Sequence, residues 1–159
     1  MAQLDRPALR ELVGELAAQP ADWESLVRHD PRQRHYEMLL VDDRVMVWLI
    51  CWMSDHDTGF HDHDLSAGAV AVVRGTLREE RLSVGASPLR RSFSAPATFD
   101  FSAGDIHRVT HPGGEPAVSI HAYSPPLWRM GTYAVEADGS LTRHSISHEQ
   151  ELRPQTLGV

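Results

Sequence analysis

From Tyr36 onward the chain alternates short β-type runs with turn residues, and this pattern constrains the fold more than any other feature of the sequence. The runs at 45–52 and 69–73 are apolar on both faces, so we expect them in the middle of the packing. Short strands at this spacing are typical of a compact antiparallel barrel or sandwich, which predicts an all-β fold. The expected strands cover residues 36–41, 45–52, 69–73, 75–82, 91–93, 98–101, 117–123, 131–135 and 141–145.

The N-terminal segment has helical periodicity instead. Apolar residues recur at helical spacing behind Asp5 and Pro7, which predicts a helix over about residues 6–18. A second, short helix is expected around Trp23. A chain of 159 residues has the size of one domain, here divided into a helical segment (1–33), a β-barrel (34–146) and a polar tail (147–159).

Charge and composition exclude several classes of partner. Fifteen Lys and Arg face twenty-two Asp and Glu, and a formal charge of −7 argues against nucleic-acid binding. The longest apolar run, 45–53, is too short to cross a bilayer, and the N-terminus lacks the basic and then apolar pattern of an export signal. Cys51 is the only cysteine, which excludes an internal disulfide and suits a reducing cytoplasm. The pattern defines no oligomeric state.

Histidine is unusually frequent, and most of the ten histidines lie in the middle of the chain. His61 and His63 are two residues apart, so in a strand their side chains emerge from the same face and can share one ion. A glycine turn at Gly104 then precedes His107, at the head of another predicted strand. Because histidine is the commonest metal ligand, this grouping indicates a metal site.

The residues around these histidines resemble the two motifs of the cupin superfamily. The matching positions are Gly59, the H-x-H pair, Gly75, Pro96 and the segment Gly104-Asp105-Ile106-His107. The resemblance implies a cupin-type antiparallel β-barrel, or jelly roll, with short N-terminal α-helices. Most cupins have a glutamate ligand where this chain has Gly68. The inferred site is therefore three neutral imidazoles with no carboxylate.

Three imidazoles are compatible with more than one metal. In an octahedral ion they leave three adjacent open positions, which suits the simultaneous binding of an anionic substrate and O2. They can equally hold a tetrahedral zinc ion with a water molecule. The ligand set alone does not choose between these metals.

Polar side chains also alternate along a later strand. Ser119, His121 and Tyr123 face the same way, so hydrogen bonds can pass from one to the next. The strand is followed directly by Ser124-Pro125-Pro126.

Several segments, in the same order and with matching gaps, resemble the thiol dioxygenases of the cysteine dioxygenase family over about residues 34–128. They are Cys51-Trp52, Phe60-His61-Asp62-His63, Gly75 with 78–81, Ile106-His107-Arg108-Val109 and residues 115–126. The resemblance implies that His61, His63 and His107 bind Fe(II). It also implies that Ser119, His121 and Tyr123 form a hydrogen-bonded relay beside the metal. In animal members a cysteine at the position of Gly68 becomes linked to the active-site tyrosine, which glycine does not allow.

A second departure concerns the substrate. Cysteine dioxygenases carry an arginine two residues after a tyrosine near the first strand, and it clamps the substrate carboxylate. Here the sequence reads Tyr36-Glu37-Met38, and methionine cannot neutralise a carboxylate. Either another arginine takes this role, with Arg108 and Arg129 nearest in sequence and Arg34 as a third candidate, or the substrate differs. Four aromatic residues are expected near the inferred pocket: Tyr36, Trp48, Trp52 and Trp128. Their rings suit a larger thiol or one with a quaternary ammonium group.

The predicted function is an Fe(II)-dependent thiol dioxygenase that oxidises a small-molecule thiol to its sulfinic acid with O2. Cysteine, 3-mercaptopropionate and ergothioneine are candidate substrates, and Tyr36, Met38, Trp52, Arg108 and Arg129 are the predicted substrate-binding residues. One alternative is another metal-dependent cupin enzyme that catalyses a different dioxygenation or an isomerisation. A second is a non-catalytic cupin sensor of a small ligand, which the lack of an appended signalling or DNA-binding segment disfavours.

Overall fold

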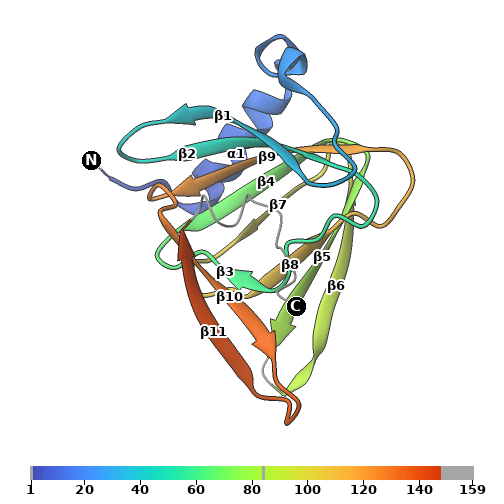
Figure 1. Ribbon diagram of the computed structural model, residues 1–159. Coiled ribbons are helices and arrows are strands. Elements are labelled where there is room, and N and C mark those ends of the chain that lie inside the picture. The colour runs from blue at the N-terminus through green and yellow to red at the C-terminus, as the bar shows by residue number, and fades with distance from the viewer. Residues whose placement is uncertain (1, 84, 148–159) are drawn as a thin grey trace.

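Two antiparallel sheets form most of the computed structural model, which describes residues 2–83 and 85–147 (Figure 1). One sheet has the strand order β1-β2-β9-β4-β7 and the other β11-β10-β3-β8-β5-β6. This arrangement confirms the predicted all-β class. The strands are β1 (His35–Val41), β2 (Met46–Trp52), β3 (His61–Asp62), β4 (Ala67–Arg74), β5 (Thr76–Ser83), β6 (Ala86–Ser94), β7 (Thr98–Phe101), β8 (His107–Thr110), β9 (Ala117–Ser124), β10 (Arg129–Val135) and β11 (Leu141–Ser147).

The N-terminal helix α1 (Arg6–Ala17) begins where the sequence predicts it. The Asp5 side chain accepts a hydrogen bond from the Ala8 amide at 2.9 Å, and a proline occupies the first turn. The predicted second helix is replaced by two 3-10 turns, η1 (Pro20–Asp22) and η2 (Glu24–Leu26). Trp23, between them, has φ near −136°, which interrupts the helical path.

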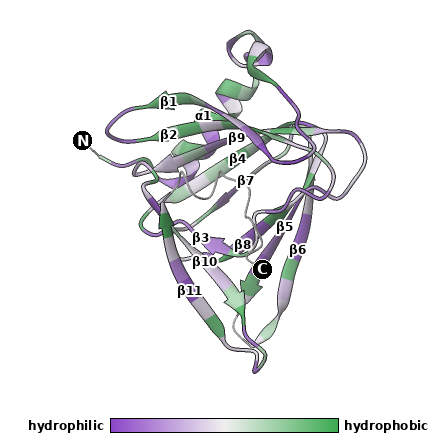
Figure 2. Cartoon of the chain, viewed as in Figure 1, coloured by the Kyte–Doolittle hydropathy of each residue, from purple (hydrophilic) through white to green (hydrophobic). Residues whose placement is uncertain are grey.

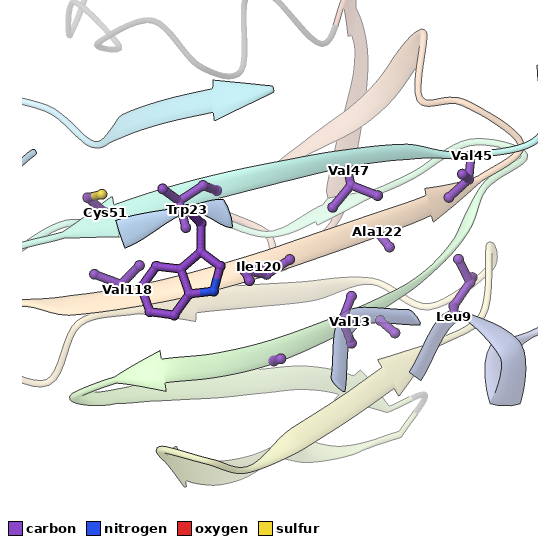
Figure 3. Close-up of a cluster of buried hydrophobic side chains, with 12 residues drawn as sticks. Leu9, Val13, Trp23, Val45, Val47, Cys51, Val118, Ile120 and Ala122 are labelled. Atoms are coloured by element: carbon purple, nitrogen blue, oxygen red, sulfur yellow. The ribbon is translucent and has the colours of Figure 1, made fainter. Parts of the chain in front are cut away.

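The helix covers the outer face of the five-stranded sheet (Figures 1 and 3). Leu9 and Val13 of α1, together with Trp23, pack against alternate residues of β2, β4 and β9. The opposite faces of the same strands point into the barrel and carry further buried residues. These strands are thus covered on both sides, which explains why their sequences are apolar without alternation. Cys51 lies in this outer core.

Hydropathy follows the same division (Figure 2). β2, β4 and β9 carry long hydrophobic stretches, whereas the short strand β3 in the other sheet is hydrophilic. Both polar residues of this strand are buried, since His61 is 4% and Asp62 7% exposed. Burial of this kind needs partners for every polar group, and these partners define the site below.

The β10–β11 hairpin forms one edge of the second sheet and turns at Gly139, whose φ is near +83°. Within the described ranges, no helix has the length and apolar character that a membrane span requires. The predicted polar tail lies outside the described residues except for Ser147. The proposed division of the chain at residues 33 and 146 stays a prediction.

Candidate metal centre and cavity

His61, His63 and His107 converge inside the barrel. In the sheet His61 on β3 pairs directly with His107 on β8, and His63 follows β3. Each ring offers a nitrogen, and the three ligand atoms lie within 4.8 Å of one another. All three side chains are buried, with exposures of 4% or less. The structure thus brings together the three histidines that the sequence predicts as metal ligands.

Hydrogen bonds on the far side of two rings fix which nitrogen faces the cluster. His61 Nδ1 lies 2.9 Å from the Gly59 carbonyl oxygen, so Nδ1 carries the proton and Nε2 keeps its lone pair. His107 Nδ1 donates to the Glu79 carboxylate at 2.8 Å, with the same consequence for its Nε2. His63 Nδ1 is buried and has no hydrogen-bond partner among the described residues.

The three rings fit a metal chemically. Burial, and then the neighbouring histidines, lower the pKa values of His61 and His63 well below 6.5, so both are neutral at physiological pH. Neutral imidazoles with their lone pairs directed together are the form that binds divalent transition metals. The donor set therefore supports a metal cofactor.

Asp62, between His61 and His63, fixes the short strand β3 to β10 and β11. Its carboxylate accepts hydrogen bonds from Arg143 Nε at 2.9 Å and Nη2 at 3.0 Å, from the Tyr133 hydroxyl and from the Gly131 amide. Burial alone would raise the pKa of Asp62, but the bonds from Arg143 and Tyr133 outweigh it and hold the pKa far below its usual range. A Cβ at Gly131 would lie 2.3 Å from Arg143, so this contact needs glycine.

A cavity opens beside the histidines. Among the described residues that line it, Arg34 has the only permanent charge, and no carboxylate takes part. The guanidinium of Arg34 lies 5.3 Å from the centre of the Trp52 ring, a cation–π arrangement. The lining residues are Arg34, Trp48, Ile50, Trp52, Thr58, His61, His107, Val109, His121, Tyr123, Leu127 and Met130.

Ser119, His121 and Tyr123 form a hydrogen-bonded chain along β9, and Trp52 extends it. Trp52 Nε1 donates to Ser119 Oγ at 2.9 Å. Ser119 Oγ lies 2.6 Å from His121 Nε2, and His121 Nδ1 lies 3.3 Å from the Tyr123 hydroxyl. Burial, and then the charges of His107 and Arg34, lower the pKa of His121 to about 3, so this ring is neutral.

These contacts give the chain a direction. An indole N–H can only donate, so Ser119 Oγ accepts from Trp52 and its own hydroxyl hydrogen is donated to His121 Nε2. His121 Nδ1–H then donates to the Tyr123 oxygen, and the phenol proton is directed away from His121. The Tyr123 ring lies 5.3 Å from that of His63, which places the phenol beside the histidine cluster.

Gly68 is paired directly opposite Tyr123 in the sheet, where the family resemblance placed it. A Cβ at Gly68 would lie 2.3 Å from the Phe101 ring, which is itself buried. Phe101 therefore fills the space next to the tyrosine that a side chain at residue 68 would need.

The predicted substrate-binding residues are not brought together. Trp52 lines the cavity, whereas Tyr36 packs edge-on against Trp48, with ring centres 5.6 Å apart, and stays outside the lining. Met38 is 41% exposed on β1, an edge strand of its sheet. The two arginines nearest in sequence to the ligands also lie elsewhere.

Arg108 lies outside the cavity because its guanidinium pairs with Asp57. Arg129 is exposed and lines a separate depression next to Trp128. Arg34, the third candidate, is the arginine that reaches the cavity.

Sequence reasoning missed Glu79, the partner of His107. The residue stands within a run of charged side chains that is typical of a solvated strand. Glu79 lies two residues after the apolar Leu77, so in a strand the two side chains face the same way, and this spacing could have indicated that Glu79 is buried. In the structure both side chains face inward and are 1% exposed. Burial alone would raise the pKa of Glu79, but the bonds from His107 and Arg81 outweigh it and lower the pKa to about 2.

Comparison with known proteins agrees with this site. The family model for cysteine dioxygenase type I matches residues 2–135. The chain belongs to the cysteine dioxygenase type I family. This membership confirms the predicted class of enzyme, a dioxygenase among the oxidoreductases.

Curated relatives of this family include cysteine dioxygenase type 1 of Danio rerio, 30% identical over 139 residues. That match covers 79% of this chain and 68% of the relative. The enzyme of the same name from Rattus norvegicus is 29% identical over 122 residues, which cover 68% of this chain and 59% of the relative.

Solved structures share the fold at low sequence identity. A protein from Thermus thermophilus aligns with a TM-score of 0.59 and 16% identity, over 66% of this chain and 95% of its own. A cupin superfamily protein from Desulfitobacterium hafniense aligns with a TM-score of 0.56 and 13% identity, over 65% and 87%. These similarities confirm the cupin-type fold.

Proposed function

We propose that the protein is an Fe(II)-dependent dioxygenase that oxidises a small, carboxylate-bearing thiol to its sulfinic acid. Both atoms of O2 are transferred to the sulfur, and the thiol supplies the four electrons that reduce them. The observation that carries this proposal is a cavity lined, among the described residues, by His61 and His107 of the three-histidine cluster, by the phenol of Tyr123 and by one arginine, Arg34. Family membership supports the same reaction class.

His61, His63 and His107 would hold the metal through one nitrogen each. When bound, a redox-active ion supplies Lewis acidity that favours the thiolate form of the substrate, and a path for electrons between sulfur and oxygen. The hydrogen bonds to Gly59 and Glu79 keep two of the rings in the tautomer this role requires.

Tyr123 would donate a hydrogen bond to the reacting oxygen or sulfur. His121 Nδ1–H already donates to the phenol oxygen, which orients the phenol proton toward the cavity and makes it more acidic. Ser119 and Trp52 hold His121 in this tautomer. The relay thus delivers a hydrogen-bond donor at one fixed point.

Arg34 would bind the substrate carboxylate. Its guanidinium rests over Trp52, whose ring limits the directions in which the side chain can point. The other described residues that line the cavity offer aromatic or aliphatic surface or neutral polar groups. A thiol acid therefore finds one matching charge there, whereas an aminothiol without a carboxylate finds none.

An oxygen-electrode assay of the Fe(II)-loaded protein tests the proposal. Cysteine, 3-mercaptopropionate and ergothioneine carry a carboxylate and cysteamine does not, so O2 uptake is expected with at least one of the first three and weakly with cysteamine. Mass spectrometry should show a product heavier by two oxygen atoms. O2 uptake without that product, or no uptake with any thiol, would contradict the proposal.

Substitution of Arg34 tests binding of the substrate carboxylate separately from the oxidation step. A charge-assisted hydrogen bond contributes about 1.5–3 kcal/mol, so Arg34→Met should raise KM for the preferred acid by about 10- to 100-fold. Arg32→Met is a matched control, because the Arg32 side chain is 86% exposed and pairs with Asp30. Equal KM values for the two variants would show that Arg34 does not bind the carboxylate.

A further inference from the structure

Glu79 is a buried carboxylate in direct contact with one of the three histidines. It lies on β5 with 1% exposure, and its Oε2 accepts the Nδ1–H of His107 at 2.8 Å. Two guanidinium groups also bond to it, Arg81 Nη2 at 3.0 Å and Arg91 Nη2 at 3.0 Å. Within the described part of the chain, three side chains thus donate to this carboxylate.

The three histidines therefore differ in the hydrogen bonds that their Nδ1 atoms make. His107 donates to a carboxylate, His61 donates to the neutral carbonyl of Gly59, and His63 Nδ1 has no partner among the described residues. A hydrogen bond to an anion makes the opposite ring nitrogen a stronger electron donor than a bond to a neutral oxygen does. His107 is therefore the strongest donor of the three.

The surrounding charges leave this effect in place. Arg81 is shared with the Asp105 carboxylate at 3.3 Å and with the Asp100 carbonyl oxygen at 2.9 Å. The Arg91 side chain is 43% exposed, so water screens its charge in part and the carboxylate keeps a net negative effect on His107. Among the described residues that line the cavity there is no carboxylate, and Glu79 is the anion bonded directly to a ligand ring.

We propose that Glu79 is a positioning residue that makes His107 the dominant ligand of the metal and supplies a negative charge that the three imidazole ligands do not carry. The inference rests on the proposed metal-binding role of the histidines. Removal of this charge should weaken metal binding and make the ferric form less favourable, because a nearby anion stabilises the higher charge of the oxidised ion. Thiol specificity is not part of the inference.

The test compares Glu79→Gln with Glu80→Gln. Glu80 is the adjacent residue on β5, and it pairs with the exposed Arg90 rather than with a histidine. We expect the Kd for Zn(II), measured on metal-free protein by competition with a chromophoric chelator, to rise about 10- to 100-fold in Glu79→Gln. It should be unchanged in Glu80→Gln. Glu79→Asp, which keeps the charge, should recover part of the affinity.

A second measurement, the Fe(III)/Fe(II) reduction potential of the iron-loaded protein, separates an effect of charge from a loss of the site's structure. The potential should shift to more positive values in Glu79→Gln. Arg91→Met should shift it the other way, because it removes a cation from Glu79 Oε1. This variant acts at a half-exposed residue and therefore remains informative if Glu79→Gln fails to fold.

The outcomes are distinguishable from a failure of the proposed thiol oxidation. Equal Zn(II) affinities and equal potentials in wild type, Glu79→Gln and Arg91→Met would overturn the role of Glu79, whatever the enzyme oxidises. If Glu79→Gln loses Zn(II) affinity while the wild type oxidises no thiol, the role of Glu79 is supported and the proposed function is overturned.

Discussion

Replacement of Asp62 by alanine tests how the metal-bearing strand is held. Asp62 is 7% exposed and accepts five hydrogen bonds, from Arg143 through two nitrogens, from Tyr133 and from the Gly131 and Asp64 amides. Breaking a buried ion pair by removing one partner costs about 3–5 kcal/mol. The Arg143 side chain keeps 37% exposure, so water replaces part of what it loses.

The expected loss for Asp62→Ala is therefore about 3 kcal/mol, which includes the two amides left without an acceptor at about 1 kcal/mol each. For a chain of this size, that loss corresponds to a fall in Tm of roughly 6–12 °C. Urea denaturation of the metal-free protein measures the free energy of unfolding directly and keeps metal binding out of the comparison.

Asp64→Asn is the matched control. Asp64 lies beside the same arginine, but its side chain is 43% exposed and 3.7 Å from the Arg143 guanidinium. Exposed pairs of this kind contribute about 0–1 kcal/mol. If Asp62→Ala costs no more than Asp64→Asn, the reasoning that β3 is fastened through its buried carboxylate is refuted.

Three further predictions concern the site and its surroundings. Gly68→Ala should destabilise the protein by about 1–3 kcal/mol, because the added Cβ would lie 2.3 Å from the Phe101 ring. Gly104→Ala is the control and should leave the stability unchanged, because no atom lies within 4 Å of the added Cβ. Equal denaturation midpoints for the two variants would contradict this prediction. The metal-free protein should lose stability as the pH falls from about 6.5 to about 3, since unfolded chains bind a proton at His121 that the folded chain does not. A His121→Asn variant should show a smaller loss in the same urea titrations, and an unchanged slope would rule the effect out. Tyr123→Phe should lower kcat about 100-fold with metal content unchanged, which turnover and metal analysis measure together; an unaltered kcat would remove the phenol from the mechanism.

The strands and the histidine cluster were predictable because their signals are local. Runs such as 117–123 have residues that favour a strand and lie within observed strands, and the H-x-H spacing places two side chains on one face. The meeting of His61 with His107 depends on sheet pairing across distant segments, which the family motifs supplied and the spacing alone did not.

The groups that support the histidines were beyond local reasoning. Glu79 and Arg143 reach the site from strands whose sequences have the charged or polar composition of solvent-exposed surface. Arg34 was one candidate among several, since only the three-dimensional path of the segment before β1 brings its guanidinium over Trp52. Charge and position in the sequence cannot separate such residues from ordinary surface arginines.

The two-sided burial of β9 has a consequence for changing the substrate range of this protein. Ile120 and Ala122 pack on the helix side while His121 and Tyr123 line the cavity, so an altered volume on either side displaces the same backbone. Laboratory selection for bulkier thiols should therefore accumulate substitutions elsewhere. Met130 lines the cavity from β10 in the other sheet, so a change in its volume acts on the relay through its packing with Tyr123 rather than through the backbone of β9.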